Sequence, residues 1–87
     1  YIFKGDGMSK TEKLIAKLKS AKHGYVWSDL VALLTSLGFT QIEGAGSRVK
    51  FVKDGVIISL HKPHPQKEIK AYAIKQIRHM LKSEGYL

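Results

Sequence analysis

The pair Asp54-Gly55, set between two segments of alternating apolar and polar residues, constrains the fold of this chain more than any other feature. The segments are residues 47–53 and 56–61, and a period of two is typical of a strand with one buried face. Asp-Gly favours a two-residue type I′ turn, because both central positions of that turn need positive φ. The sequence therefore predicts an antiparallel hairpin over residues 47–61, with one apolar and one polar face.

Helical periodicity flanks this hairpin on both sides. Residues 9–22 repeat apolar residues at spacings of three and four, opposite several lysines. A second helix is predicted to begin with Ser28 as its N-cap and to end at Gly38. A third is predicted over residues 68–83, with Gly85 as its C-cap.

Residues 39–43 add one more alternating segment before the hairpin. The predicted fold is therefore α+β, a double-stranded-RNA-binding-like α-β-β-β-α arrangement with a three-stranded antiparallel sheet and an extra N-terminal helix. Helices that cover one face of the sheet would leave the other face open. With 87 residues the chain suits one small domain, which we place at residues 9–87. Residues 1–8 are expected to be a tag or a disordered leader.

The charge of the chain is strongly positive and unevenly distributed. The net charge is +8, and residues 47–87 carry nine Lys and Arg against three acids. A polyanion is therefore expected to bind the second half of the chain. The absence of cysteine excludes disulfides and thiolate metal sites and favours a reducing compartment. No apolar run approaches the roughly 18 residues of a membrane span, so we expect no membrane association and a soluble, cytoplasmic protein.

Arg48 and Lys50 are the first candidates for a functional role. The alternation places both on the open face of the second strand, beside a glycine-rich turn. There they could hold phosphates, and Arg48 could stabilise negative charge that develops on a phosphorane. The alternative is a solvated strand face that only keeps the sheet soluble.

His61 and His64 are the second pair of candidates. Imidazoles with a pKa near neutrality suit proton transfer, and together with the neighbouring cations they suit RNA binding and cleavage. As a metal site, His-x-x-His supplies only two ligands, and the acids of the chain are scattered, so we expect no metal and no cofactor. The alternative is a polar loop in which the prolines simply end the strand.

The last helix carries further cations at helical spacing. Lys75, Arg78 and Lys82 form one basic stripe, which in most helices is only a solvated face. We count Lys62, Lys75 and Arg78 among the candidate RNA contacts. Trp27 and Tyr72 occur at spacings that predict core positions instead of base stacking.

From Trp27 onward the chain resembles the HicA toxins of HicA–HicB toxin–antitoxin pairs. Several segments carry the resemblance by their order and spacing. They are Trp27-Ser28-Asp29-Leu30, Leu37-Gly38-Phe39, Gly46-Ser47, His61-Lys62-Pro63-His64-Pro65 and the basic helix from Ile77 to Gly85.

This resemblance implies a bacterial mRNA endonuclease that acts without the ribosome and is neutralised by a HicB-like antitoxin covering its active face. The family usually has a catalytic histidine after Gly-Ser, where this chain has Arg48. The leading hypothesis is therefore a metal-independent endoribonuclease that acts by 2′-OH attack, with His61 or His64 as acid or base. The alternatives are a non-catalytic RNA-binding or antitoxin-binding module of the same fold, and a domain whose basic face meets only an acidic protein.

Overall fold

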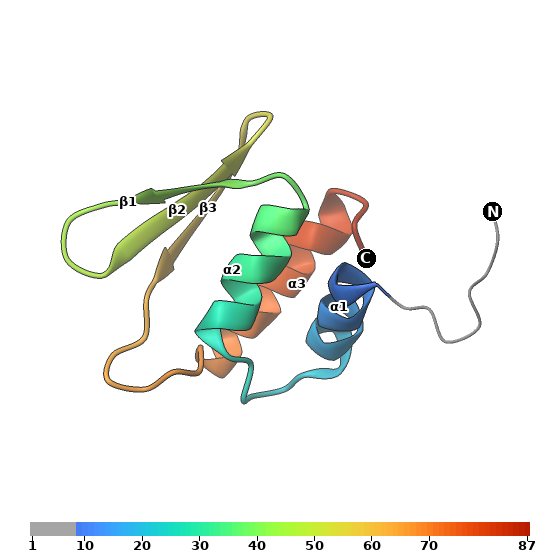
Figure 1. Cartoon of the computed structure of the whole chain (residues 1–87), viewed down its shortest axis with the longest axis horizontal. Coiled ribbons are helices and arrows are strands. Elements are labelled where there is room, and N and C mark those ends of the chain that lie inside the picture. Colours follow the sequence, from blue (N-terminus) through green and yellow to red (C-terminus); the bar gives the residue numbers. More distant parts are fainter. Residues whose placement is uncertain (1–8) are drawn as a thin grey trace, which may run out of the picture.

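The hairpin predicted around Asp54-Gly55 forms two of the three strands of the sheet in the computed structural model, which describes residues 9–87 (Figure 1). Strands β2 (Arg48–Lys53) and β3 (Val56–His61) pair antiparallel through this turn. Its two residues have φ of 50° and 84°, as a type I′ turn requires. Strand β1 (Thr40–Glu43) pairs antiparallel with the other edge of β2 and completes a three-stranded sheet in the order β1-β2-β3.

Three helices complete the predicted α-α-β-β-β-α order, and the α+β prediction is confirmed. Helices α2 (Trp27–Ser36) and α3 (Ala71–Ser83) lie beside the sheet, and α1 (Lys10–Ser20) lies on their far side (Figure 1). The predicted leader at residues 1–8 lies outside the described residues.

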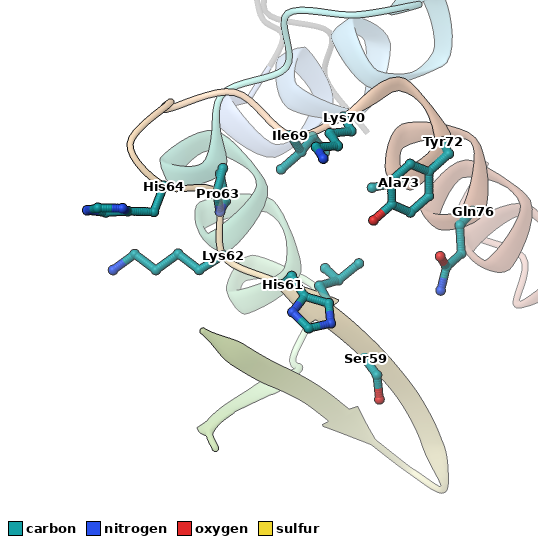
Figure 2. Close-up of a pocket in the computed structure, with 11 residues that line it drawn as sticks. Ser59, His61, Lys62, Pro63, His64, Ile69, Lys70, Tyr72, Ala73 and Gln76 are labelled. Atoms are coloured by element: carbon teal, nitrogen blue, oxygen red, sulfur yellow. The ribbon is translucent and has the colours of Figure 1, made fainter. Parts of the chain in front are cut away.

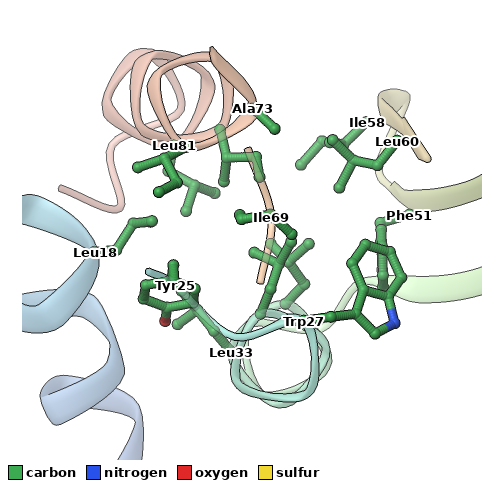
Figure 3. Close-up of a cluster of buried hydrophobic side chains, with 14 of the residues drawn as sticks. Leu18, Tyr25, Trp27, Leu33, Phe51, Ile58, Leu60, Ile69, Ala73 and Leu81 are labelled. Carbon is green, nitrogen blue, oxygen red and sulfur yellow. The ribbon is translucent and has the colours of Figure 1, made fainter. Parts of the chain in front are cut away.

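One hydrophobic core joins the helices to β2 and β3. Trp27 packs near Phe51 at the sheet end of this core, with their ring centroids 6.1 Å apart. Tyr25 and Leu18 lie at the other end, beside α1 (Figure 3). The fully buried large side chains are Leu18, Tyr25, Leu30, Leu33, Leu34, Phe51, Ile58, Ile74, Ile77 and Leu81.

Helix α1 is attached to the rest of the molecule by burial and by polar contacts. Ser9 and Glu12 form a capping box at its start. Leu14 and Leu18 are buried, and the Tyr25 hydroxyl donates a hydrogen bond of 3.0 Å to the carbonyl of Leu14. The helix predicted over residues 9–22 is therefore present, but it covers only Lys10–Ser20, with Ser9 as its N-cap and Ala21 as its C-cap.

The prediction that Ser28 caps α2 is wrong. The helix begins at Trp27, and its N-cap, two residues before Ser28, is Val26, which makes no side-chain hydrogen bond. Val26 forms an isolated antiparallel bridge with Glu68, and the Trp27 N–H donates to the carbonyl of Lys67 at 2.8 Å. This pairing across the chain fixes the start of the helix, because it satisfies the first free N–H without a side-chain cap.

The third helix begins at Ala71, three residues later than predicted. Ile69 is buried as expected, but it lies in the extended segment that pairs with the chain before α2, where its N–H donates to the carbonyl of Tyr25. After β3 the chain therefore returns to the helical layer through residues 62–70. This path places the loop that contains His64, which we call the histidine loop, beside the start of α3.

Candidate functional site

The open face of the sheet carries the two cations of β2. Arg48 and Lys50 are exposed, whereas Val49 and Phe51 between them are buried, so the predicted alternation is confirmed. Strand β3 alternates in the same sense, with Ile58 and Leu60 buried and Ser59 exposed. Side chains of the two strands that point away from the core therefore share one face.

The register of the hairpin places Arg48 directly opposite His61. Lys50 lies opposite Ser59 in the same antiparallel pairing. Side chains directly opposite one another on one face have Cβ atoms about 5 Å apart, within reach of the same small group. A guanidinium, an ammonium and an imidazole that are separated in sequence are thus gathered at one end of the open face.

A hollow of about 380 Å³ begins where β3 ends. Ser59 and His61 line it from the strand, and Tyr72 and Gln76 line it from the first turns of α3 (Figure 2). Its buried apolar lining comes from Leu60, Ile69 and Ala73. The hollow lies within the size range of small-molecule sites and has several polar groups at its rim.

His64 and Lys62 also line this hollow, from the loop that follows β3. Both are exposed, and Figure 2 shows their side chains extending away from Tyr72 and Gln76. His61 and His64 therefore belong to one surface without facing each other. His61 is the histidine that lies next to both the cations of β2 and the hollow.

Tyr72 does not occupy the core position predicted for it. Its side chain is 63% exposed, whereas Trp27, predicted in the same way, is buried. The inward face of α3 is formed by Ala73, Ile74, Ile77 and Leu81, and Tyr72 does not lie on that face. Tyr72 lies on the polar face instead, one helical turn before Lys75 and Gln76, and its ring forms part of the rim of the hollow.

Two of the predicted RNA contacts, Lys75 and Arg78, lie outside both this hollow and the open face of the sheet. Lys75 is exposed further along α3, and Arg78 is half-buried against α1. Nη1 of Arg78 donates to the carbonyls of Leu18, Lys19 and Ala21 at 3.3, 3.3 and 2.8 Å. Arg78 therefore satisfies the free carbonyls at the C-terminal end of α1.

One tyrosine has a strongly shifted pKa. Burial raises the pKa of Tyr25 to about 12, and the nearby carboxylate of Asp29 adds to the shift. Its hydroxyl is held as a donor to α1, so this shift belongs to the packing of α1 and not to the hollow.

No three His, Cys, Asp or Glu side chains within residues 9–87 are gathered closely enough to hold a metal ion. None of the helices in the same range is both long and apolar enough to cross a membrane.

Comparison with known proteins gives one match. A family model described as the HicA toxin of bacterial toxin–antitoxin matches residues 27–85. No curated protein and no solved structure matches the chain. The matched region begins with the first residue of α2 and includes the sheet, the histidine loop and α3, and it leaves α1 outside.

Proposed function

Because this chain belongs to the HicA toxin family of bacterial toxin–antitoxin systems, we propose that it is a toxin that cleaves single-stranded mRNA without a metal ion. The family implies pairing with a HicB antitoxin, which would cover the open face and the hollow. The reaction would take place in the bacterial cytoplasm, where both partners are made. The observation that carries the proposal is the cross-strand pairing of Arg48 with His61, the histidine that lines the hollow.

The proposed reaction is attack by a ribose 2′-OH on the adjacent phosphorus. His61 accepts the proton of the 2′-OH, and the new bond to phosphorus forms as the bond to the 5′-oxygen breaks. Water, or His64 on the loop side of the hollow, supplies a proton to the departing 5′-oxygen. The products are a 2′,3′-cyclic phosphate and a free 5′-OH.

Arg48 and Lys50 would act on the phosphate itself. The guanidinium of Arg48 can donate two parallel hydrogen bonds to phosphate oxygens, and its charge stabilises the phosphorane. Lys50, one pleat further along the same face, would hold the neighbouring phosphate as a point charge. Lys62 would add a further cation on the loop side of the hollow.

The test is to incubate the protein with a structureless RNA in excess chelator and to map the ends of the products. We expect cyclic phosphate ends from the intact protein and strongly reduced cleavage from His61→Ala and His64→Ala. His23→Ala is the matched control, because His23 is exposed and does not line the hollow. DNA of the same sequence should remain intact, since it lacks the nucleophile. Full cleavage by both histidine variants would reject the assignment.

A second candidate function is binding without cleavage, either of RNA or of the antitoxin alone. It is favoured by Arg48 at the position where the resemblance implies a catalytic histidine, because arginine stays protonated and cannot act as a general base at neutral pH. RNA that is bound in a salt-sensitive manner but recovered intact would support this candidate.

A further inference from the structure

The hollow lined by His61 and His64, which we call the histidine hollow, is the first of three that follow one another along α3. The second hollow shares Tyr72 with the first and is also lined by Lys22 and Lys75. The third shares Lys75 with the second and is also lined by Lys19 and Lys82. Because neighbouring hollows share lining residues, they form one continuous surface from the end of β3 to the C-terminal end of α1. We call the part of this surface that is formed by Lys19, Lys22, Lys70, Tyr72, Lys75 and Lys82 the α3 track.

The α3 track is positively charged along its whole length. Its five lysines are exposed, and none of the residues that line the three hollows is Asp or Glu. Within residues 9–87 the ion pair is Lys17 with Asp29, on another side of α1, so no lysine of the track is neutralised by a carboxylate there. A row of unneutralised ammonium groups attracts a linear polyanion.

Tyr72 distinguishes a nucleic acid from other polyanions. Its ring is 63% exposed and lies at the junction of the first and second hollows, between Lys70 and Lys75 in sequence. An aromatic face between phosphate-binding cations is the combination by which proteins hold single strands, because each base can stack while the backbone follows the charges. An acidic protein would use the lysines but has no base to place on the ring.

We propose that single-stranded RNA continues from the histidine hollow along the α3 track, with a base stacked on Tyr72 and phosphates against Lys75, Lys22 and Lys19. This inference rests on the proposed function. It assigns a role to α1, which lies outside the family match and contributes Lys19, and to Lys22 in the segment that follows it. Arg78 is the positioning residue of the track, because its bonds to the α1 carbonyls hold these two lysines beside α3.

The test measures binding of 2′-O-methyl RNA, which lacks the nucleophilic hydroxyl and remains intact. A tetranucleotide that reaches only the histidine hollow is compared with a dodecanucleotide that extends along the track. The track variant is Lys19→Gln/Lys22→Gln. Its matched control is Lys10→Gln/Lys13→Gln, which removes the same charge from exposed positions of α1 that line none of the three hollows.

We expect the track variant to weaken binding of the dodecanucleotide about tenfold at low salt and to reduce the slope of log K against log salt by about 1.4, the value for two phosphates on a single strand. Binding of the tetranucleotide should be unchanged, and the control should change binding of either RNA less than twofold. Tyr72→Ala should weaken binding of the dodecanucleotide about fivefold or more, whereas Tyr72→Trp should retain it.

Equal effects of the two double variants would overturn the proposal, because net charge alone would then explain binding. Equal binding of RNA by Tyr72→Ala and the intact protein would overturn it too. If polyglutamate then bound the intact protein and the control but not the track variant, the partner of the track would be an acidic protein. These outcomes are separate from the proposed function. A protein that shows length-dependent binding but no cleavage retains the track, and one that cleaves without length dependence retains only the active site.

Discussion

At the scale of single residues, the proposed chemistry depends on Arg48 lying opposite His61. We expect Arg48→Ala to lower the single-turnover cleavage rate about 100-fold, because a donor aimed at developing charge is lost. Arg48→Lys should recover only part of this loss, since lysine keeps the charge without the planar fork. Lys10→Ala controls for net charge. Wild-type rates in Arg48→Ala would remove Arg48 from the mechanism.

The pairing of Arg48 with His61 could be predicted from the sequence alone. A two-residue turn at Asp54-Gly55 places Lys53 opposite Val56, and counting back along both strands brings Arg48 opposite His61. The start of α3 at Ala71 could not be predicted in this way, because that boundary is set by the pairing of residues 67–69 with the chain before α2.

Tyr25 gives a residue-scale prediction about pH. Its pKa is raised from 10.0 to about 12 in the folded protein, so the folded state holds the phenolic proton more tightly than the unfolded state. The resulting stabilisation, about 3 kcal/mol, is fully present below pH 10 and is lost as the pH rises to about 12. We expect the free energy of unfolding to fall over this range.

Tyr25→Phe is the control for this pH dependence, because it removes the titrating group. It should cost roughly 1–3 kcal/mol at neutral pH, since the Leu14 carbonyl loses its donor. The fall in stability above pH 10 should then be smaller than in the intact protein. Parallel curves for the two proteins, measured by urea unfolding, would assign the pH dependence to other groups.

At the scale of elements, Arg78 is the contact that fixes the end of α1. Arg78→Ala removes the donor to three backbone carbonyls, so we expect a loss of roughly 1–3 kcal/mol in the free energy of unfolding. Amide exchange should accelerate in α1 before it accelerates in β2 and β3. Lys75→Ala, an exposed neighbour on the same helix, should leave exchange unchanged. Uniform acceleration would argue against a local role.

Gly55, in the β2–β3 turn, can be compared with Gly44, in the β1–β2 turn. Gly55 has φ of 84°, and a Cβ atom there would meet nothing within 4 Å, so Gly55→Ala tests backbone conformation alone. We expect a cost of about 1 kcal/mol in urea unfolding. Gly44→Ala is the control, because Gly44 has no positive φ and an added Cβ makes ordinary contacts at 3.6 Å. Equal effects would show that the turn does not depend on positive φ.

The elements themselves were predictable where local signals agreed. The hairpin and the end of α2 at Ser36, shortly before Gly38 with its positive φ, follow from turn and cap residues in the sequence. The start of α2 was not predictable, because its first free N–H is satisfied by Lys67, forty residues later in the chain. Local capping patterns such as that of Ser28 carry no information about such a distant partner.

At the scale of the whole molecule, the structure is arranged in layers, with the open sheet face at one side and α1 at the other (Figure 1). The proposed active site lies where the sheet layer meets α3, and the α3 track runs from there to the end of α1. The family match covers the sheet, α2 and α3. The position of α1 therefore decides whether the track is a stable surface or a transient one.

The last prediction concerns whether α1 belongs to the same cooperative unit as the matched region. Leu18 is fully buried, so Leu18→Ala should cost roughly 2–5 kcal/mol, a large share of the stability of a small domain. If α1 folds with the rest, this loss should lower the melting temperature of the whole protein by roughly 10 °C or more.

Trp27, which packs near Phe51 at the sheet end of the core, reports melting far from the substitution by its fluorescence. Far-UV circular dichroism and Trp27 fluorescence should then give coincident transitions. Ile57→Ala, at an exposed position of the sheet, should shift neither. An early loss of helix while the fluorescence transition stays in place would instead show α1 melting alone, and the lysines it contributes would not be held beside α3.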